Sequence, residues 1–180
     1  MKKNADVYDL IYSVYQGNEG VLEFLIPHSE CVAELAVRIA NEHKKADVDF
    51  VERAALLHDI GIFKTHAPNV KCLGSAPYIQ HGILGKEILE SRGFLREAIV
   101  AQTHIGVGLT AKYILENDIP LPAVDMVPTT LEEKIVAYAD LFFSKKRLTT
   151  PKTVEEVEKT VKKYGDESYE VFKKWHKKFG

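Results

Sequence analysis

The feature that most constrains this chain is a helix-spaced apolar run that ends in a histidine, an aspartate and a glycine. Val51, Ala54 and Leu57 recur at the spacing of one helix face, and His58-Asp59 and then Gly61 follow them. An adjacent histidine and aspartate are not unusual by themselves. Further imidazole and carboxylate groups, however, stand at similar intervals on other helix-spaced segments: His28, His81, His104 and Asp140. We therefore predict a scaffold that gathers these groups around metal.

The rest of the chain repeats this pattern of amphipathic segments separated by glycine or proline. We predict helices over about 5–16, 27–44, 49–58, 80–92, 95–105, 111–117 and 131–141, and two more between 153 and 178, divided at Gly165. Pro27 suits a first helical position, where its missing N–H has no partner, so His28 is expected in the first turn. Residues 61–79 predict a long loop, and loops of this length are often functional. No segment predicts a strand. The fold class is therefore all-α, a multi-helix bundle with a metal site between its helices.

Composition places the chain among ordinary globular proteins. The 180 residues are 46% apolar and 28% charged, which predicts a single domain over 1–180. A net charge of −2 predicts neither general nucleic-acid binding nor membrane binding, and no segment approaches the roughly 20 apolar residues of a bilayer span. Cys31 and Cys72 lie far apart in no CxxC pattern, which favours a reducing compartment. We predict a cytoplasmic protein.

The ligand set predicts a pair of divalent metal ions. Imidazole and carboxylate ligands suit iron, manganese, zinc and related ions, with nickel, cobalt and magnesium as further candidates. His58 and Asp59 point about a third of a turn apart, so Asp59 can bridge two metals while His58 binds one. His28 and Asp140 would complete the first site with His58, and the second would contain the remaining histidines, His81 and His104.

Two divalent ions would leave this site with a net positive charge, which attracts anions such as phosphate. Paired metals also hold the attacking and departing oxygens in phosphoester hydrolysis and lower the pKa of bound water to about 7. The ligand type and number therefore favour hydrolysis of a phosphoester.

These residues resemble the signature of the HD-domain metal-dependent phosphohydrolases: a first histidine, an adjacent His-Asp pair and a final aspartate. The segment 57–61 is similar to their HDIG subgroup, and the similarity continues through 80–85, 103–106 and 131–140, so that it covers about 21–145. The resemblance implies that His28, His58-Asp59 and Asp140 bind one metal. Family members with two extra histidines bind two metals, and His81 and His104 stand at those places. Separately, we predict that the amphipathic helices over 153–178 pack on this core.

One position departs from the family pattern. Many relatives carry a lysine or arginine three residues after the aspartate of the pair, where this chain has Ile62. The first cation after the pair is Lys64, which is a candidate phosphate contact. Asp59 and Lys64 are the candidate catalytic residues. His66 either contacts substrate phosphate, acts as an acid or is a solvated loop residue. The basic run 145–147 either contacts an anionic substrate or caps a helix dipole, and capping is favoured.

The predicted activity is hydrolysis of a phosphomonoester or phosphodiester bond in a nucleotide-like small molecule, with a metal-bound hydroxide as nucleophile. Two alternatives stay open. The same ligand set resembles that of the di-iron oxygenases, which would act on a small polyol or phosphonate. A non-catalytic module that senses a nucleotide is the other. The expected partner is a small phosphoester.

Four aromatic residues form a stripe near the C-terminus: Tyr169, Phe172, Trp175 and Phe179. We expect this stripe to pack either on the domain or on a second copy of the chain in a homodimer.

Overall fold

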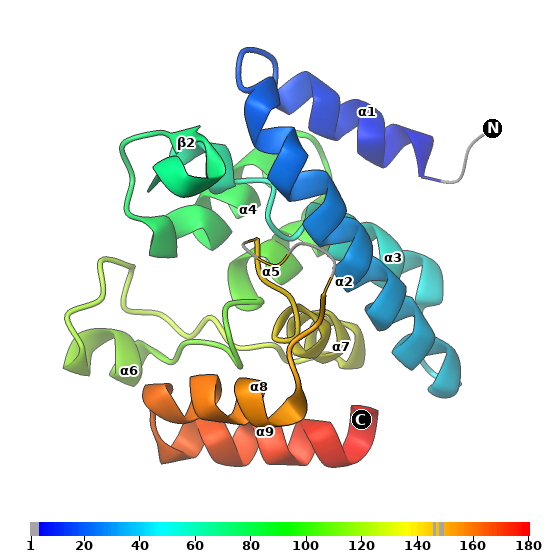
Figure 1. The fold of residues 1–180 in the computed structure, drawn as a ribbon, viewed down its shortest axis with the longest axis vertical. Helices are drawn as coiled ribbons and strands as arrows, with labels where there is room; N and C mark the ends of the chain where they lie inside the picture. The colour runs from blue at the N-terminus through cyan, green and yellow to red at the C-terminus, as the bar shows by residue number, and fades with distance from the viewer. Residues whose placement is uncertain (1–3, 146, 148–149) are drawn as a thin grey trace.

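The computed structural model describes residues 4–145, 147 and 150–180. Most of the described chain is helical, which confirms the predicted all-α class (Figure 1). The helices are α1 Ala5–Val14, α2 Leu22–Glu42, α3 Val48–Leu57, α4 His81–Ser91, α5 Leu95–Thr103, α6 Ala111–Glu116, α7 Leu131–Asp140, α8 Val154–Val161 and α9 Asp166–Phe179. Short 3-10 helices cover Glu19–Val21, Ile62–Lys64, Pro68–Val70, Tyr78–Gln80 and Lys162–Tyr164. None of the described helices combines the length and the apolar character needed to cross a bilayer.

The start of α2 differs from the prediction. The helix begins at Leu22 and contains Pro27, so His28 lies in its second turn. Pro27 lacks the N–H that would bond to the carbonyl of Glu23. Because Glu23 is exposed, water can satisfy that carbonyl, and the buried side chains of Val21 and Leu25 hold the first turn in place.

The predicted loop over 61–79 contains a small hairpin, which corrects the expectation of no strand. β1, His66–Ala67, pairs antiparallel with β2, Cys72–Leu73. Strands of two residues are too short to show an alternating pattern in the sequence. Gly74 allows the close approach, because a Cβ there would lie 2.0 Å from the carbonyl oxygen of Lys64. The hairpin therefore holds the chain after the His-Asp pair in one place.

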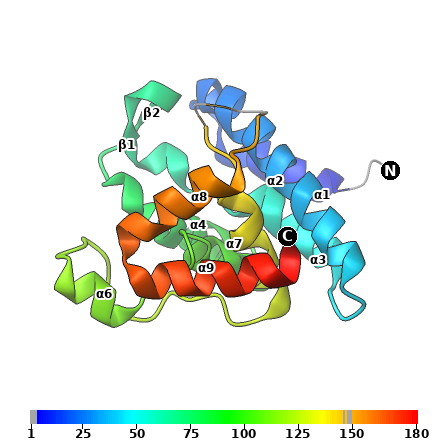
Figure 2. The ribbon, with the colours of Figure 1, turned by 60° about the horizontal axis from the view of Figure 1, so that its bottom comes forward.

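The core surrounds α7, which contacts α2, α3, α5 and α9. In Figure 2, α8 and α9 lie together across one face of the molecule, in front of α7. The C-terminal aromatic stripe packs on its own chain: Phe172, Trp175 and Phe179 are buried, and the Phe172 ring stacks on Tyr138 of α7 with 6.1 Å between centroids. Tyr138 also shares a hydrogen bond of 2.7 Å with His176 Nδ1.

Candidate metal centre

Five helices bring the predicted ligands to one place. His28 lies in α2, His58-Asp59 directly follows α3, His81 is the first residue of α4, His104 directly follows α5, and Asp140 is the last residue of α7. The four histidines and Asp59 are buried, and 22% of the Asp140 side chain is exposed. Because most of these positions are at helix ends, their side chains converge while the helix bodies pack against one another.

Asp59 lies between two pairs of histidines. Its Oδ2 is 3.1 Å from His28 Nε2 and 3.2 Å from His58 Nε2. Its Oδ1 is 3.4 Å from His81 Nε2 and 3.7 Å from His104 Nε2. The two oxygens of one carboxylate therefore face different histidine pairs, as a bridging ligand requires.

The distances between ligand atoms match those around a metal ion. The Nε2 atoms of His28 and His58 are 3.3 Å apart, and His28 Nε2 is 3.1 Å from Asp140 Oδ1. Nitrogen and oxygen ligands lie about 2.1 Å from zinc-like ions, so two of them around one ion are about 3.0–3.4 Å apart. His28, His58 and Asp140 form one group that could hold an ion; His58, Asp59 and His104 form another.

Backbone carbonyls orient three of the imidazole rings. The Nδ1 atoms of His58, His81 and His104 lie 2.6, 2.7 and 2.8 Å from the carbonyl oxygens three residues earlier in the chain. Each Nδ1–H donates to its carbonyl, which leaves the Nε2 of a neutral ring with a lone pair. Outer contacts of this kind are usual for metal-binding histidines.

The contact between His81 and His104 indicates whether a cation fits this site. Burial lowers the pKa of His81 to about 4, so this ring is neutral near pH 7. His81 Nε2 then directs a lone pair at His104 Nε2, 3.1 Å away, and in the Nδ1–H tautomer of a neutral ring that second nitrogen carries a lone pair as well. Such an arrangement is repulsive unless a cation lies between or beside the two nitrogens. The donor set therefore fits a divalent metal.

Electrostatics in this cluster also favour positive charge. Burial alone would raise the pKa of Asp59, but the charges of Lys145 and His58 outweigh it and hold that pKa well below the usual range. Burial lowers the pKa of His58, yet Asp59 and Asp140 together raise it to about 10. The two carboxylates therefore attract a proton or a metal ion to the same point.

Lys145 is the residue of this cluster that sequence reasoning placed elsewhere. The sequence favours a helix-capping role for the basic run after α7, but the Lys145 ammonium contacts Asp59 Oδ2, and only 12% of its side chain is exposed. Burial lowers the pKa of Lys145, and the charge of Asp59 more than reverses this and holds it well above its usual range. Lys146 lies outside the described residues, and Arg147 pairs with Glu156 at 2.8 Å. The basic run itself was the signal that could have identified Lys145.

A cavity of about 600 Å³ opens beside His28 and Asp140. Most of its polar lining can donate hydrogen bonds: His66, Tyr78, Ser144, Lys145, Lys152 and Tyr164. Within the described chain this lining includes His66 but not Lys64, which is exposed, while Ile62 is buried. The roles predicted for Lys64 and His66 stay predictions, and only His66 stands at the cavity.

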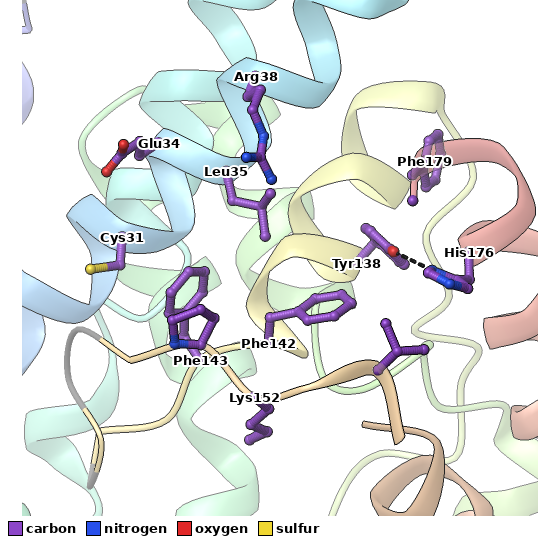
Figure 3. Close-up of a pocket in the computed structure, with 13 residues that line it drawn as sticks. Cys31, Glu34, Leu35, Arg38, Tyr138, Phe142, Phe143, Lys152, His176 and Phe179 are labelled. Carbon is purple, nitrogen blue, oxygen red and sulfur yellow. Dashed lines mark hydrogen bonds between the residues drawn. The ribbon is translucent and has the colours of Figure 1, made fainter. Parts of the chain in front are cut away.

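A second cavity of about 600 Å³ adjoins the first, because Phe143 and Lys152 line both. Figure 3 shows Leu35 and Arg38 of α2 on one side, the hydrogen-bonded Tyr138–His176 pair on the other and Phe142 between them. This second cavity is mainly apolar and aromatic.

Comparisons with known proteins identify relatives of this chain. Residues 25–143 match the model of the HD domain family. The uncharacterized protein MJ0778 of Methanocaldococcus jannaschii is 40% identical over 148 residues, which cover 81% of this chain and 80% of that protein. Two proteins named tRNA (cytidine(56)-2'-O)-methyltransferase, from Thermoplasma volcanium and Picrophilus torridus, are each 35% identical. The matches cover 84% and 73% of this chain but only 40% and 35% of those proteins.

A solved structure has the same fold. The HD domain of the L. monocytogenes phosphodiesterase PgpH superposes with a TM-score of 0.54 at 17% identity, over 92% of this chain and 94% of that one. At this identity the likeness concerns the fold alone. The family match covers more than half of the chain, and the ligand positions lie within it. The chain belongs to the HD domain family.

Proposed function

We propose that this chain is a metal-dependent phosphohydrolase that cleaves a phosphomonoester or phosphodiester bond of a nucleotide-like small molecule. The observation that carries the proposal is the position of Asp59, whose two oxygens face two separate histidine pairs. In this assignment His28, His58 and Asp140 would hold one ion, His81 and His104 would hold the other, and Asp59 would supply one oxygen to each. When bound, such a pair of divalent ions supplies Lewis acidity and a hydroxide nucleophile near neutral pH.

The cavity beside the ligands suits an anionic group. Within its described lining, Asp140 is the sole carboxylate, whereas Lys145 and Lys152 bring two positive charges. The hydroxyls of Tyr78, Ser144 and Tyr164 add hydrogen-bond donors at the same wall. These groups support the binding of a phosphoryl group whose oxygens accept several hydrogen bonds.

The second cavity supports a substrate with a sizeable organic group. Its volume of about 600 Å³ lies within the range of small-molecule sites, about 300–1,000 Å³. Phe142 and Phe143 offer aromatic surface to a flat ring such as a nucleobase. Because two relatives carry the name of a tRNA-modifying enzyme, nucleoside 2'- and 3'-phosphates belong among the substrates to be tested.

Metal removal tests this proposal. We expect the purified protein to contain close to two ions per chain by mass spectrometry, to lose phosphatase or phosphodiesterase activity on chelation, and to regain it with at least one of iron, manganese, cobalt, nickel, zinc or magnesium. The panel comprises nucleoside mono- and polyphosphates, cyclic nucleotides and dinucleoside polyphosphates. A protein that neither contains nor acquires metal would contradict the assignment.

The same experiment separates the two alternatives. An iron-loaded protein that consumes oxygen with a polyol or phosphonate, and releases no phosphate from the panel, would be an oxygenase. A metal-loaded protein that is inactive on the whole panel but is stabilised against heat by one nucleotide would be a sensing module.

The substitution Phe143→Leu tests the second cavity. Leucine keeps apolar bulk but removes a ring face, and aromatic pairs contribute about 0.5–1.5 kcal/mol beyond their buried area. We therefore expect the KM for an active nucleoside phosphate to rise about 2- to 10-fold, while the KM for methyl phosphate, which has no ring, changes less than about 2-fold. Phe94→Leu is the matched control, since Phe94 is partly buried but lines neither cavity. An equal rise for both substrates would contradict a base-binding role.

A further inference from the structure

Lys145 occupies the junction between the candidate metal centre and the cavity. Its ammonium contacts Asp59 Oδ2, the oxygen that also lies 3.1 Å from His28 Nε2 and 3.2 Å from His58 Nε2. The same side chain lines the cavity of about 600 Å³. One buried cation therefore faces both a candidate bridging carboxylate and the space available to a substrate.

The contact between Lys145 and Asp59 competes with metal binding. When Asp59 Oδ2 binds a divalent ion, like-charge repulsion acts on an ammonium at the same oxygen. The lysine stem has four rotatable carbons, so its ammonium can move toward the cavity without a change in the backbone. In that position a mostly buried ammonium requires an anionic or polar partner.

The cavity offers few anionic partners of its own. Within the described lining Asp140 is the sole carboxylate, and its Oδ1 already lies 3.1 Å from His28 Nε2. The phosphoryl group of a substrate is the anion that would fill this need. We propose that Lys145 binds a non-bridging oxygen of the substrate phosphoryl group, an inference that rests on the proposed phosphohydrolase function.

Neighbouring cations are less suited to this role. Ile62, three residues after Asp59, is buried and carries no charge. Lys64 is exposed and does not belong to the described lining of the cavity. Lys152 does line it, but its ammonium donates to the carbonyl of Leu141 at 2.9 Å. Lys145, in the segment after α7, therefore places a lysine at the cavity, whereas Ile62 and Lys64, in the segment after α3, do not.

Two described residues near Lys145, Ser144 and Arg147, take part in hydrogen bonds or ion pairs. The N–H of Arg147 donates to the carbonyl of Ser144 at 2.9 Å, and the Arg147 guanidinium pairs with Glu156 of α8. The Lys145 ammonium lies 5.9 Å from the centre of the ring of Tyr78, a residue that also lines the cavity. These contacts hold Ser144 and Arg147, while the ammonium of Lys145 can lie against Asp59 or against a phosphate in the cavity.

The test compares Lys145→Met, Lys145→Arg and the control Lys112→Met, whose native side chain is 68% exposed on α6. Methionine keeps the length of the stem and removes the charge, whereas arginine keeps the charge. The readouts are metal content by mass spectrometry, binding of inorganic phosphate to the metal-loaded protein by calorimetry, and kcat and KM on an active phosphoester.

We expect Lys145→Met to keep its metal content and to bind inorganic phosphate about 10- to 100-fold more weakly, the effect of losing one charged hydrogen bond. Its kcat/KM should fall by about 100-fold, because the contact also stabilises charge in the transition state. Lys145→Arg should recover much of the phosphate affinity, and Lys112→Met should match the unaltered protein.

Two results would overturn the inference. One is a folded Lys145→Met protein with unchanged phosphate affinity and unchanged kcat/KM. The other is a loss of bound metal in both Lys145 variants, because Lys145 would then serve the metal centre and not the substrate. If the unaltered protein hydrolyses no ester on the panel, the proposed function fails, while the calorimetric comparison with inorganic phosphate still decides whether Lys145 binds the anion.

Discussion

Replacement of Asp59 by asparagine is expected to abolish phosphoester hydrolysis and to remove most of the bound metal. Asparagine has nearly the same shape, so the fold should persist, but it offers one neutral oxygen in place of two charged ones. Both histidine pairs then lose the group that faces them at 3.1–3.7 Å. Metal ions contribute several kcal/mol to charge stabilisation in the transition state, so kcat/KM should fall by about a thousandfold or more.

The matched control is Asp9→Asn, because Asp9 is exposed on α1. This variant should keep both activity and metal content. The measurements are phosphate release, metal content by mass spectrometry, and thermal unfolding with and without a chelator. Undiminished hydrolysis by the Asp59→Asn protein would show that the chemistry lies elsewhere in the molecule.

Replacement of Gly61 by alanine is expected to destabilise the fold around the metal centre. A Cβ at this position would lie 2.3 Å from the carbonyl oxygen of His81 and 2.4 Å from the amide nitrogen of Gly85. Both atoms belong to the backbone of α4, so the overlap can be relieved only if the helix moves. Overpacking of this kind costs about 3 kcal/mol or more, which corresponds to a fall in Tm of about 6–12 °C for a chain of this size.

Gly61→Ala should also weaken metal binding, because a displaced α4 carries His81 away from Asp59 and His104. Gly20→Ala is the matched control: the nearest atom there is Lys71 Cδ at 3.2 Å, in a flexible side chain. Its stability should change by less than about 0.5 kcal/mol. The measurements are the Tm of thermal unfolding and the metal content of both variants. An unchanged Tm and full metal content in Gly61→Ala would mean that α4 does not need this close approach.

Gly61 and Gly82 thus have a packing role beside the candidate metal centre. Gly61 has a φ of −85°, which any residue can adopt. Glycine is therefore needed at this position because it has no side chain. Gly82 behaves similarly, since a Cβ there would lie 2.6 Å from the carbonyl oxygen of Ala101 in α5. Two glycines therefore let α4 approach both the turn after α3 and the body of α5. This close packing brings His81 within 3.1 Å of His104.

Local patterns were sufficient to predict most of the helices and the set of ligand-type residues. Helix spacing depends on neighbours three and four residues apart, and Thr153 with Glu156 forms the capping box that starts α8. The start of α2 was misplaced because the burial of Val21 and Leu25, which no local rule contains, outweighs the preference of Pro27 for a first position. The hairpin after Gly61 was missed because each strand has two residues.

By itself, the sequence determined which chemical groups this protein can gather: four imidazoles and two carboxylates placed on amphipathic segments, most of them at helix ends. The tertiary structure decided how they face one another, with each oxygen of Asp59 toward a different histidine pair. It also decided that Lys145 and not Lys64 contacts this cluster. The physical reason is that Lys64 ends a single 3-10 turn and Lys145 lies in a turn after α7, and at such places side-chain direction depends on packing against distant segments and not on α-helical spacing.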